Sequence, residues 1–179
     1  MLPLTPQARF EQAVLPHLAA AYNLARWLTR NDQDAEDVVQ EACLRALKFF
    51  GGYRGGDGRA WLLKIVRNTA HTWLRRNRAP EFSLSLSEEL HGIPDDAPGP
   101  EALLLQSADR QWLRQALADL PVEFREVVVL HDLEGLAYKE IADIADIPLG
   151  TVMSRLARAR KRLQRCLVQR LNEESGFEL

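Results

Sequence analysis

The feature that most constrains the fold is a pair of helices separated by a short turn, predicted for residues 138–170. In the second helix, apolar residues recur at intervals of three and four and form one stripe: Val152, Leu156, Ala159, Leu163 and Leu167. In the first helix, Ile141, Ala142 and Ala145 are expected to face inward. Two such helices form a helix-turn-helix.

The second of these helices is strongly basic. From Leu149 to Arg170 there are seven Lys/Arg and no acid. The side opposite the apolar stripe carries hydroxyls and cations: Thr151, Ser154, Arg155, Arg158, Lys161, Arg162 and Arg165. Residues near the start of such a helix can reach base edges, and later cations can meet phosphates. A solvated helix with extended arginines is the alternative, but the lack of acids in a helix-turn-helix favours DNA binding.

Charge is segregated along the chain, although the net charge is only −2. Residues 1–79 carry 12 Lys/Arg against 7 Asp/Glu, and residues 80–108 carry no cation against 6 acids. Such segregation indicates separate surfaces for separate partners. An apolar content of 46% excludes a disordered chain.

Patterns typical of metal sites, disulfide frameworks and membrane spans are missing from the sequence. Cys43 and Cys166 are far apart and form no CxxC, which argues against a zinc site or a disulfide. No apolar run approaches the ~20 residues of a membrane span, and the first residues do not resemble a signal peptide. We therefore expect a reduced, cytoplasmic protein without metal, cofactor or membrane insertion.

The N-terminal part is predicted to be helical. Thr5 and Pro6 suit the N-cap and first position of a helix that runs to about Arg30, and Pro16 is expected to kink or split it. A second helix is predicted over 34–50, capped by Asp32 or Asp34. Its buried stripe is predicted to contain Ala35, Val38, Val39, Ala42, Ala46 and Phe49.

The outer face of this second helix places a leucine among polar residues. Around Leu44 lie Asp34, Asp37, Gln40, Glu41 and Lys48. An apolar anchor with an acidic rim suits a basic partner. A solvated face with one exposed leucine is equally compatible with the helix alone.

A glycine-rich loop at 51–58 precedes a third predicted helix over 59–76. Its buried side should hold Leu62, Ile65, Val66, Thr69 and, with core favoured, Trp73. The other surface, including the loop, combines cations, polar groups and aromatic rings: Tyr53, Arg54, Trp61, Lys64, Arg67, Asn68, His71, Arg75, Arg76 and Arg78. This mixture suits single-stranded nucleic acid, because bases stack on rings and phosphates meet cations.

Residues 80–100 are acidic and rich in Ser, Pro and Gly, which predicts a flexible linker. The predicted fold class is all-α: a domain at 1–79, an acidic linker at 80–100, and a helix-turn-helix domain at 101–179. At ~3.3 Å per residue the linker could extend to about 70 Å. No motif of a phosphate loop, metalloprotease or hydrolase occurs, so we expect no enzyme and no catalytic residue.

Three stretches together resemble the bacterial sigma factors of the extracytoplasmic-function group: DAEDVVQEACLRAL, FFGGYRGGDGRAWLLKIVRNTAHTWLRRNR and LPVEFREVVVLHDLEGLAYKEIADIADIPLGTVMSRLARARKRL. The resemblance implies that the Leu44 face binds the core of RNA polymerase. It implies that the basic third helix and its loop capture the single-stranded −10 element. It also implies that the second helix of the helix-turn-helix, with Tyr138, reads the duplex −35 element.

The resemblance further implies an anti-sigma factor as a partner and no obligate homo-oligomer. Asp146 stands where the family's turn usually has Gly, and Met153 stands where a polar or basic residue is usual. Cys43 replaces a common aromatic, and Leu47 replaces a frequent Trp. These differences affect the expected promoter sequence. The alternatives are a stand-alone helix-turn-helix regulator, which would bind duplex DNA without polymerase, and a nucleic-acid-processing enzyme, which would need clustered metal-ligating carboxylates.

Overall fold

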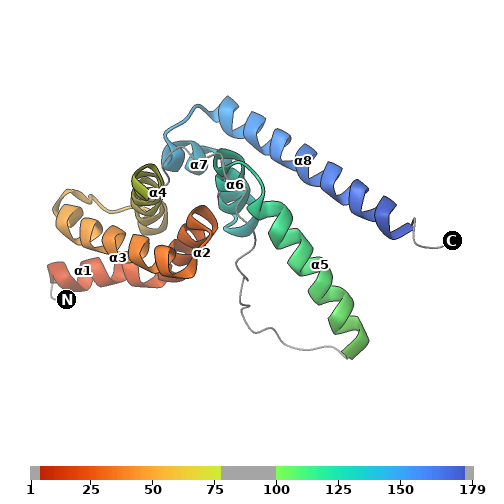
Figure 1. Cartoon of the computed structure of the whole chain (residues 1–179). Helices are drawn as coiled ribbons and strands as arrows, with labels where there is room; N and C mark the ends of the chain where they lie inside the picture. The colour runs from red at the N-terminus through yellow and green to blue at the C-terminus, as the bar shows by residue number, and fades with distance from the viewer. Residues whose placement is uncertain (1–4, 78–99, 176–179) are drawn as a thin grey trace.

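The computed structural model describes residues 5–77 and 100–175, with side chains described over 5–77 and 109–173 (Figure 1). Every regular element in these ranges is a helix, so the predicted all-α class is confirmed. Within the described ranges, no helix combines the length and the apolar character needed to span a bilayer. The predicted acidic linker lies outside the described residues apart from Pro100, at which α5 begins.

The N-terminal domain begins with a helix that proline divides in two. The Thr5 side chain caps α1 (Pro6–Val14) by accepting a hydrogen bond from the Ala8 N–H at 3.2 Å. A short 3₁₀ turn at Pro16, η1 (Leu15–His17), separates α1 from α2 (Leu18–Thr29). The predicted cap and split are therefore both confirmed.

Helix α3 (Asp32–Phe49) corrects two predictions. Its N-cap is Asn31, whose side chain accepts from the Asp34 N–H at 3.0 Å, so neither Asp32 nor Asp34 caps it. Phe49 was predicted to be buried, but it is 61% exposed, because the helix ends at that residue and the core does not extend beyond Ala46.

A 3₁₀ turn, η2 (Phe50–Gly52), and the glycine-rich loop lead into α4 (Gly58–Asn77). Gly58 is required for close packing, since a Cβ there would lie 2.5 Å from the backbone oxygen of Ala13. Trp73 is half-buried and packs against the core, in agreement with the core interpretation.

The C-terminal domain consists of α5 (Pro100–Ala118), α6 (Val122–Val128), a π-helical turn η3 (Val129–Leu133), α7 (Tyr138–Ala145) and α8 (Leu149–Ser175). Helices α7 and α8 form the predicted helix-turn-helix. Asp146 ends α7 in the left-handed conformation, with φ 54°. An L-residue other than Gly rarely adopts this conformation, although Asp and Asn tolerate it better than most.

The apolar stripe of α8 is buried only near its start. Val152, Leu156 and Ala159 are buried, whereas Leu163 is half-buried and Leu167 is exposed. Leu167 was expected to lie on the buried stripe, but it is exposed. The later part of α8 extends away from α6 and α7, so these helices do not cover it (Figure 1).

The two domains pack against each other. Helix α4 contacts α7, and α2 contacts α6 and η3 (Figure 1). Buried apolar residues of both domains belong to a single contiguous cluster, which includes Leu24 and Leu63 as well as Leu130 and Ile141. The part of the chain that the structure describes is therefore closed, with the domains in direct contact.

Candidate nucleic-acid interface

The outward face of α8 presents the predicted duplex-reading residues to solvent. Ser154, Arg158, Lys161, Arg162 and Arg165 are exposed, and Thr151 and Arg155 are half-buried. The Ser154 hydroxyl donates to the Thr151 backbone oxygen at 3.1 Å. Met153 is exposed beside this face at the start of the helix. Tyr138 lies at the start of α7, where its ring is 4.9 Å from the His131 ring.

Other cations of α8 hold the domain together. Arg160 donates to Asp132 of η3 at 3.0 Å, and Arg170 donates to Asp109 of α5 at 2.8 Å. Arg162 of the outward face does both, since it is exposed and its guanidinium lies 5.2 Å from the centre of the Phe124 ring. Basic residues of α8 thus divide between a solvent face and structural pairs, a division that charge counting alone does not reveal.

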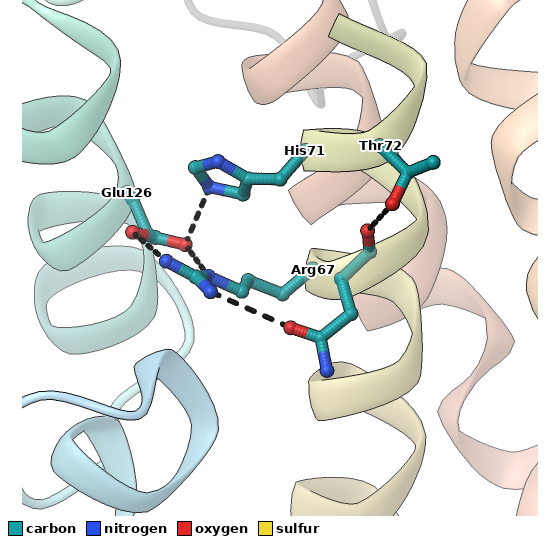
Figure 2. A network of polar contacts seen from close by, with 5 residues as sticks. Arg67, His71, Thr72 and Glu126 are labelled. Carbon is teal, nitrogen blue, oxygen red and sulfur yellow. Dashed lines mark hydrogen bonds and ion pairs between the residues drawn. The ribbon is translucent and has the colours of Figure 1, made fainter. Parts of the chain in front are cut away.

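The predicted strand-binding surface of α4 is only partly open. Lys64, Asn68, Arg75 and Arg76 are exposed. Arg67 and His71 instead point across the domain boundary to Glu126 of α6 (Figure 2). Their side chains are 17% and 26% exposed, and that of Glu126 is 0% exposed. Arg78 lies outside the described residues.

We call Arg67, His71 and Glu126 the Glu126 cluster. Arg67 Nε donates to Glu126 Oε1 at 2.5 Å, Arg67 Nη2 donates to Oε2 at 3.4 Å, and His71 Nε2 lies 3.1 Å from Oε1. Burial by itself raises the pKa of the Glu126 carboxyl, but the hydrogen bonds and charges of His71 and Arg67 outweigh it. The pKa of Glu126 is consequently lower than its ordinary value, and the carboxylate is ionised at neutral pH.

A second group of polar contacts, the Glu134 cluster, joins the domains nearby. Arg59 Nη2 donates to Glu134 Oε2 at 2.8 Å, and Asn23 Nδ2 donates to Glu134 Oε1 at 2.5 Å. Arg59 also donates to the Glu134 backbone oxygen at 2.5 Å. Sequence reasoning missed both carboxylates, because nothing in a local pattern links them to residues of the other domain.

Aromatic rings gather where the glycine-rich loop meets α4. Tyr53 stacks on Phe50 with 5.4 Å between centroids, and Trp61 lies 4.8 Å from Tyr53. The Tyr53 hydroxyl donates to the Gly56 backbone oxygen at 2.8 Å. Sequence reasoning selected Tyr53 and Trp61 but missed Phe50, although Phe50 directly precedes the loop and is itself aromatic.

An open hollow lies beside these rings. Its lining includes Arg9, His17, Phe50, Tyr53 and the glycine-rich loop from residue 55 to residue 58. Arg54 of the loop is exposed. The structure thus brings Tyr53 and Trp61 together at this end of α4, away from the Glu126 cluster.

The outer face of α3 is more apolar than predicted. Leu44 and Leu47 are 62% and 58% exposed. Asp37, Gln40 and Glu41 are exposed around Leu44, and Asp34 is half-buried. Glu41 accepts a hydrogen bond from Arg45 at 2.7 Å. The structure places all five predicted docking residues on α3 and adds Leu47, one turn after Leu44, to the apolar surface.

Among the described residues, no group of three or more His, Cys, Asp or Glu is arranged to hold a metal ion. Cys43 is half-buried and Cys166 is exposed, and both are free thiols. Burial raises the pKa of the Cys43 thiol.

Comparison with known protein families gives two matches in chain order. Residues 13–79 match Sigma-70 region 2, and residues 110–163 match Sigma-70, region 4. The first match ends where the N-terminal helices end, and the second covers α6 through most of α8 together with the end of α5.

Individual relatives extend the similarity over almost the whole chain. The RNA polymerase sigma-H factor of Pseudomonas aeruginosa is 31% identical over 172 residues, which cover 92% of this chain and 89% of the relative. The ECF RNA polymerase sigma factor SigE of Mycolicibacterium smegmatis is 35% identical over 164 residues, 92% of this chain, and the match spans 63% of that relative's length.

A solved structure has a similar fold. The sigma factor RpoE of Bartonella quintana, crystallised with the anti-sigma factor NepR, superposes with a TM-score of 0.67 at 27% identity. The match covers 89% of this chain and 96% of that one.

Proposed function

Since the chain belongs to the extracytoplasmic-function sigma factors of bacterial RNA polymerase, whose members direct the enzyme to promoters, we propose the following division of labour between its domains. The N-terminal domain, residues 1–79, docks on the polymerase core and captures the single-stranded −10 element. The C-terminal domain, residues 101–179, reads the −35 duplex. The chain performs no covalent chemistry, because the polymerase supplies the catalysis.

The −35 reading role is supported by the outward face of α8. The Ser154 hydroxyl and Arg158 lie near the start of α8, where side chains meet base edges in the major groove. Lys161, Arg162 and Arg165 follow further along, where a helix leaving the groove meets phosphates. Tyr138, at the start of α7, is assigned to the DNA backbone.

The −10 role is supported by the aromatic rings at the loop and the cations of α4. Tyr53 and Trp61 offer stacking surfaces, and Arg54, Lys64, Arg75 and Arg76 are exposed to meet phosphates. Asn68 is exposed on α4, and its side-chain amide can hydrogen-bond a base. Arg67 and His71 complete this surface once they leave Glu126.

Docking on the core is assigned to the outer face of α3. Leu44, with Leu47 beside it, is an apolar anchor, and Asp37, Gln40 and Glu41 form its polar rim. A polymerase subunit of this kind acts in the cytoplasm. Because a related sigma factor has been crystallised with an anti-sigma factor, an anti-sigma factor is a further proposed partner.

The observation that carries the proposal is the pairing of an exposed docking helix with a separate basic recognition helix in one chain of this family. The test is reconstituted transcription: core polymerase, the purified chain and candidate promoter DNA. Specific transcripts should require both the chain and the core. Tight, sequence-specific duplex binding by the chain alone, without specific transcription when core is added, would instead identify a stand-alone regulator.

A further inference from the structure

The polar contacts between the two domains follow a consistent charge pattern. Carboxylates come from the C-terminal domain, at Glu126 and Glu134, and their donors come from the N-terminal domain, at Arg67, His71 and Arg59. Of these donors, Arg67 and His71 belong to the proposed −10 surface. The same groups therefore cannot hold the domains together and contact a DNA strand at once.

The geometry at Glu126 imitates the recognition of a phosphate. Arg67 offers Nε and Nη2 to the two carboxylate oxygens (Figure 2). A guanidinium offers the same pair of donors to two phosphate oxygens. His71 adds a third contact to the same carboxylate at 3.1 Å. Glu126 thus occupies the donors that a strand phosphate would require.

Burial of the Glu126 carboxylate strengthens its interaction with Arg67 and His71. Glu126 is 0% exposed, and solution ions screen a buried pair much less than a surface pair. Removing one partner of such a pair leaves the other charge in the interface without compensation, which strongly disfavours the closed arrangement.

We propose that Glu126 is an intramolecular competitor of the −10 strand, so that the closed chain is an autoinhibited state. The Glu134 cluster supports the same closure from a site that lies outside the proposed −10 residues. The inference rests on the proposed role of Arg67 and His71 in strand capture. Separation of the domains exposes both residues and completes the strand-binding surface.

The principal test uses Glu126→Gln in the full-length chain, with Glu123→Gln as the matched control. Glu123 lies on the same helix and is exposed. The radius of gyration from small-angle X-ray scattering reports opening, and far-UV circular dichroism reports folding. Fluorescence anisotropy with a short labelled oligothymidylate reports strand binding, because base stacking tolerates any sequence.

Glu126→Gln is expected to raise the radius of gyration, retain the helical content and bind the oligothymidylate about tenfold or more tightly than the parent chain. Glu123→Gln should match the parent in all three measurements. A folded Glu126→Gln chain with the parent's radius and affinity overturns the proposal. Opening without a gain in strand affinity overturns it as well.

A charge exchange at the Glu134 cluster keeps the test decisive if Glu126→Gln does not fold. Arg59 and Glu134 are 30% and 10% exposed, so substitutions there are less disruptive than at Glu126. Arg59→Glu and Glu134→Arg should each open the chain and increase strand binding, since each places like charges together. The double variant should close it again. Single variants that remain closed, or a double variant that remains open, would contradict the proposal.

The underlying functional assignment is tested separately. Arg67→Ala in reconstituted transcription asks whether Arg67 contributes to initiation, whereas the radius of gyration requires neither DNA nor polymerase. Normal initiation by Arg67→Ala would refute the strand-capture role even if Glu126→Gln opens the chain.

Discussion

Glu126 is a fully buried carboxylate, and such a group is tolerated only where its charge is compensated. Its pKa is lowered from the ordinary value of 4.5 by His71 and Arg67, against the opposing effect of burial. A carboxyl whose pKa is lower in the folded state contributes stability above its ordinary pKa. That contribution is lost as the pH falls through the lowered value.

We therefore expect Glu126→Gln to reduce the free energy of unfolding by about 3 kcal/mol at neutral pH. The difference from the parent should shrink toward zero in acid, because a protonated Glu126 resembles glutamine. Urea denaturation of both chains over a pH series measures this, and the comparison cancels the titration of other carboxyls. A difference that does not change with pH would show that Glu126 acts through packing alone.

Gly58 is a second residue whose role is set by its surroundings. A Cβ at this position would lie 2.5 Å from the backbone oxygen of Ala13, and the backbone cannot move aside as a side chain can. Gly58→Ala should destabilise the chain by about 1–3 kcal/mol. Gly51→Ala is the control, since nothing lies within 4 Å of its Cβ position. Equal midpoints of urea denaturation for the two variants would contradict the close contact between α1 and α4.

At the scale of elements, α8 separates base reading from phosphate anchoring. Arg158→Ala should relax preference at one or two −35 positions and cost about 1–3 kcal/mol on the preferred sequence. Arg165→Ala should weaken all sequences about equally and lower the salt slope by about one unit. Holoenzyme binding to promoter duplexes with single −35 changes, at several salt concentrations, measures both. Uniform loss in both variants would make Arg158 another phosphate contact.

Helix α3 carries a prediction about the polymerase. Asp37→Lys or Leu44→Asp should weaken association with core polymerase and leave the helical content unchanged. Asp37→Lys reverses a charge of the acidic rim, and Leu44→Asp removes the apolar anchor. Glu11→Lys reverses a charge at an exposed site on α1 and should have no effect. Co-elution with core polymerase on size exclusion provides the measurement, and full co-elution of both α3 variants would exclude this face.

Much of each element could be predicted because its causes are local. Pro16 divides the first helix, Thr5 caps it, and the α7–α8 turn occurs where expected. The predicted N-cap of α3 was wrong because neighbouring residues can make the same capping hydrogen bond. The predicted burial of two apolar residues was wrong because their helices continue past the core. Asn31 caps α3 in place of a neighbouring aspartate, and Phe49 and Leu167 continue an apolar period past the atoms that could bury them.

At the scale of the whole molecule, the contact between domains was not predictable. The helical period correctly placed Arg67 and His71 on the side of α4 away from its core stripe. It could not show that Glu126, from a distant part of the sequence, occupies that side. The segregation of charge indicated separate surfaces, but not that one domain supplies the counter-charges of the other.

Because the outer face of α3 is exposed in the closed chain, binding to polymerase and binding to a strand can follow a fixed order. Leu44 and Leu47 are accessible while the domains remain together, whereas Arg67 and His71 are not available to a strand. Docking on polymerase can therefore come first and strand capture second. Core polymerase should accordingly increase the strand affinity of the parent chain, and should do so far less for Glu126→Gln, as anisotropy with and without core would measure. A chain arranged in this way would pass single-stranded DNA elsewhere in the cell without being retained, and would acquire its affinity for the strand at the promoter, after the enzyme has arrived.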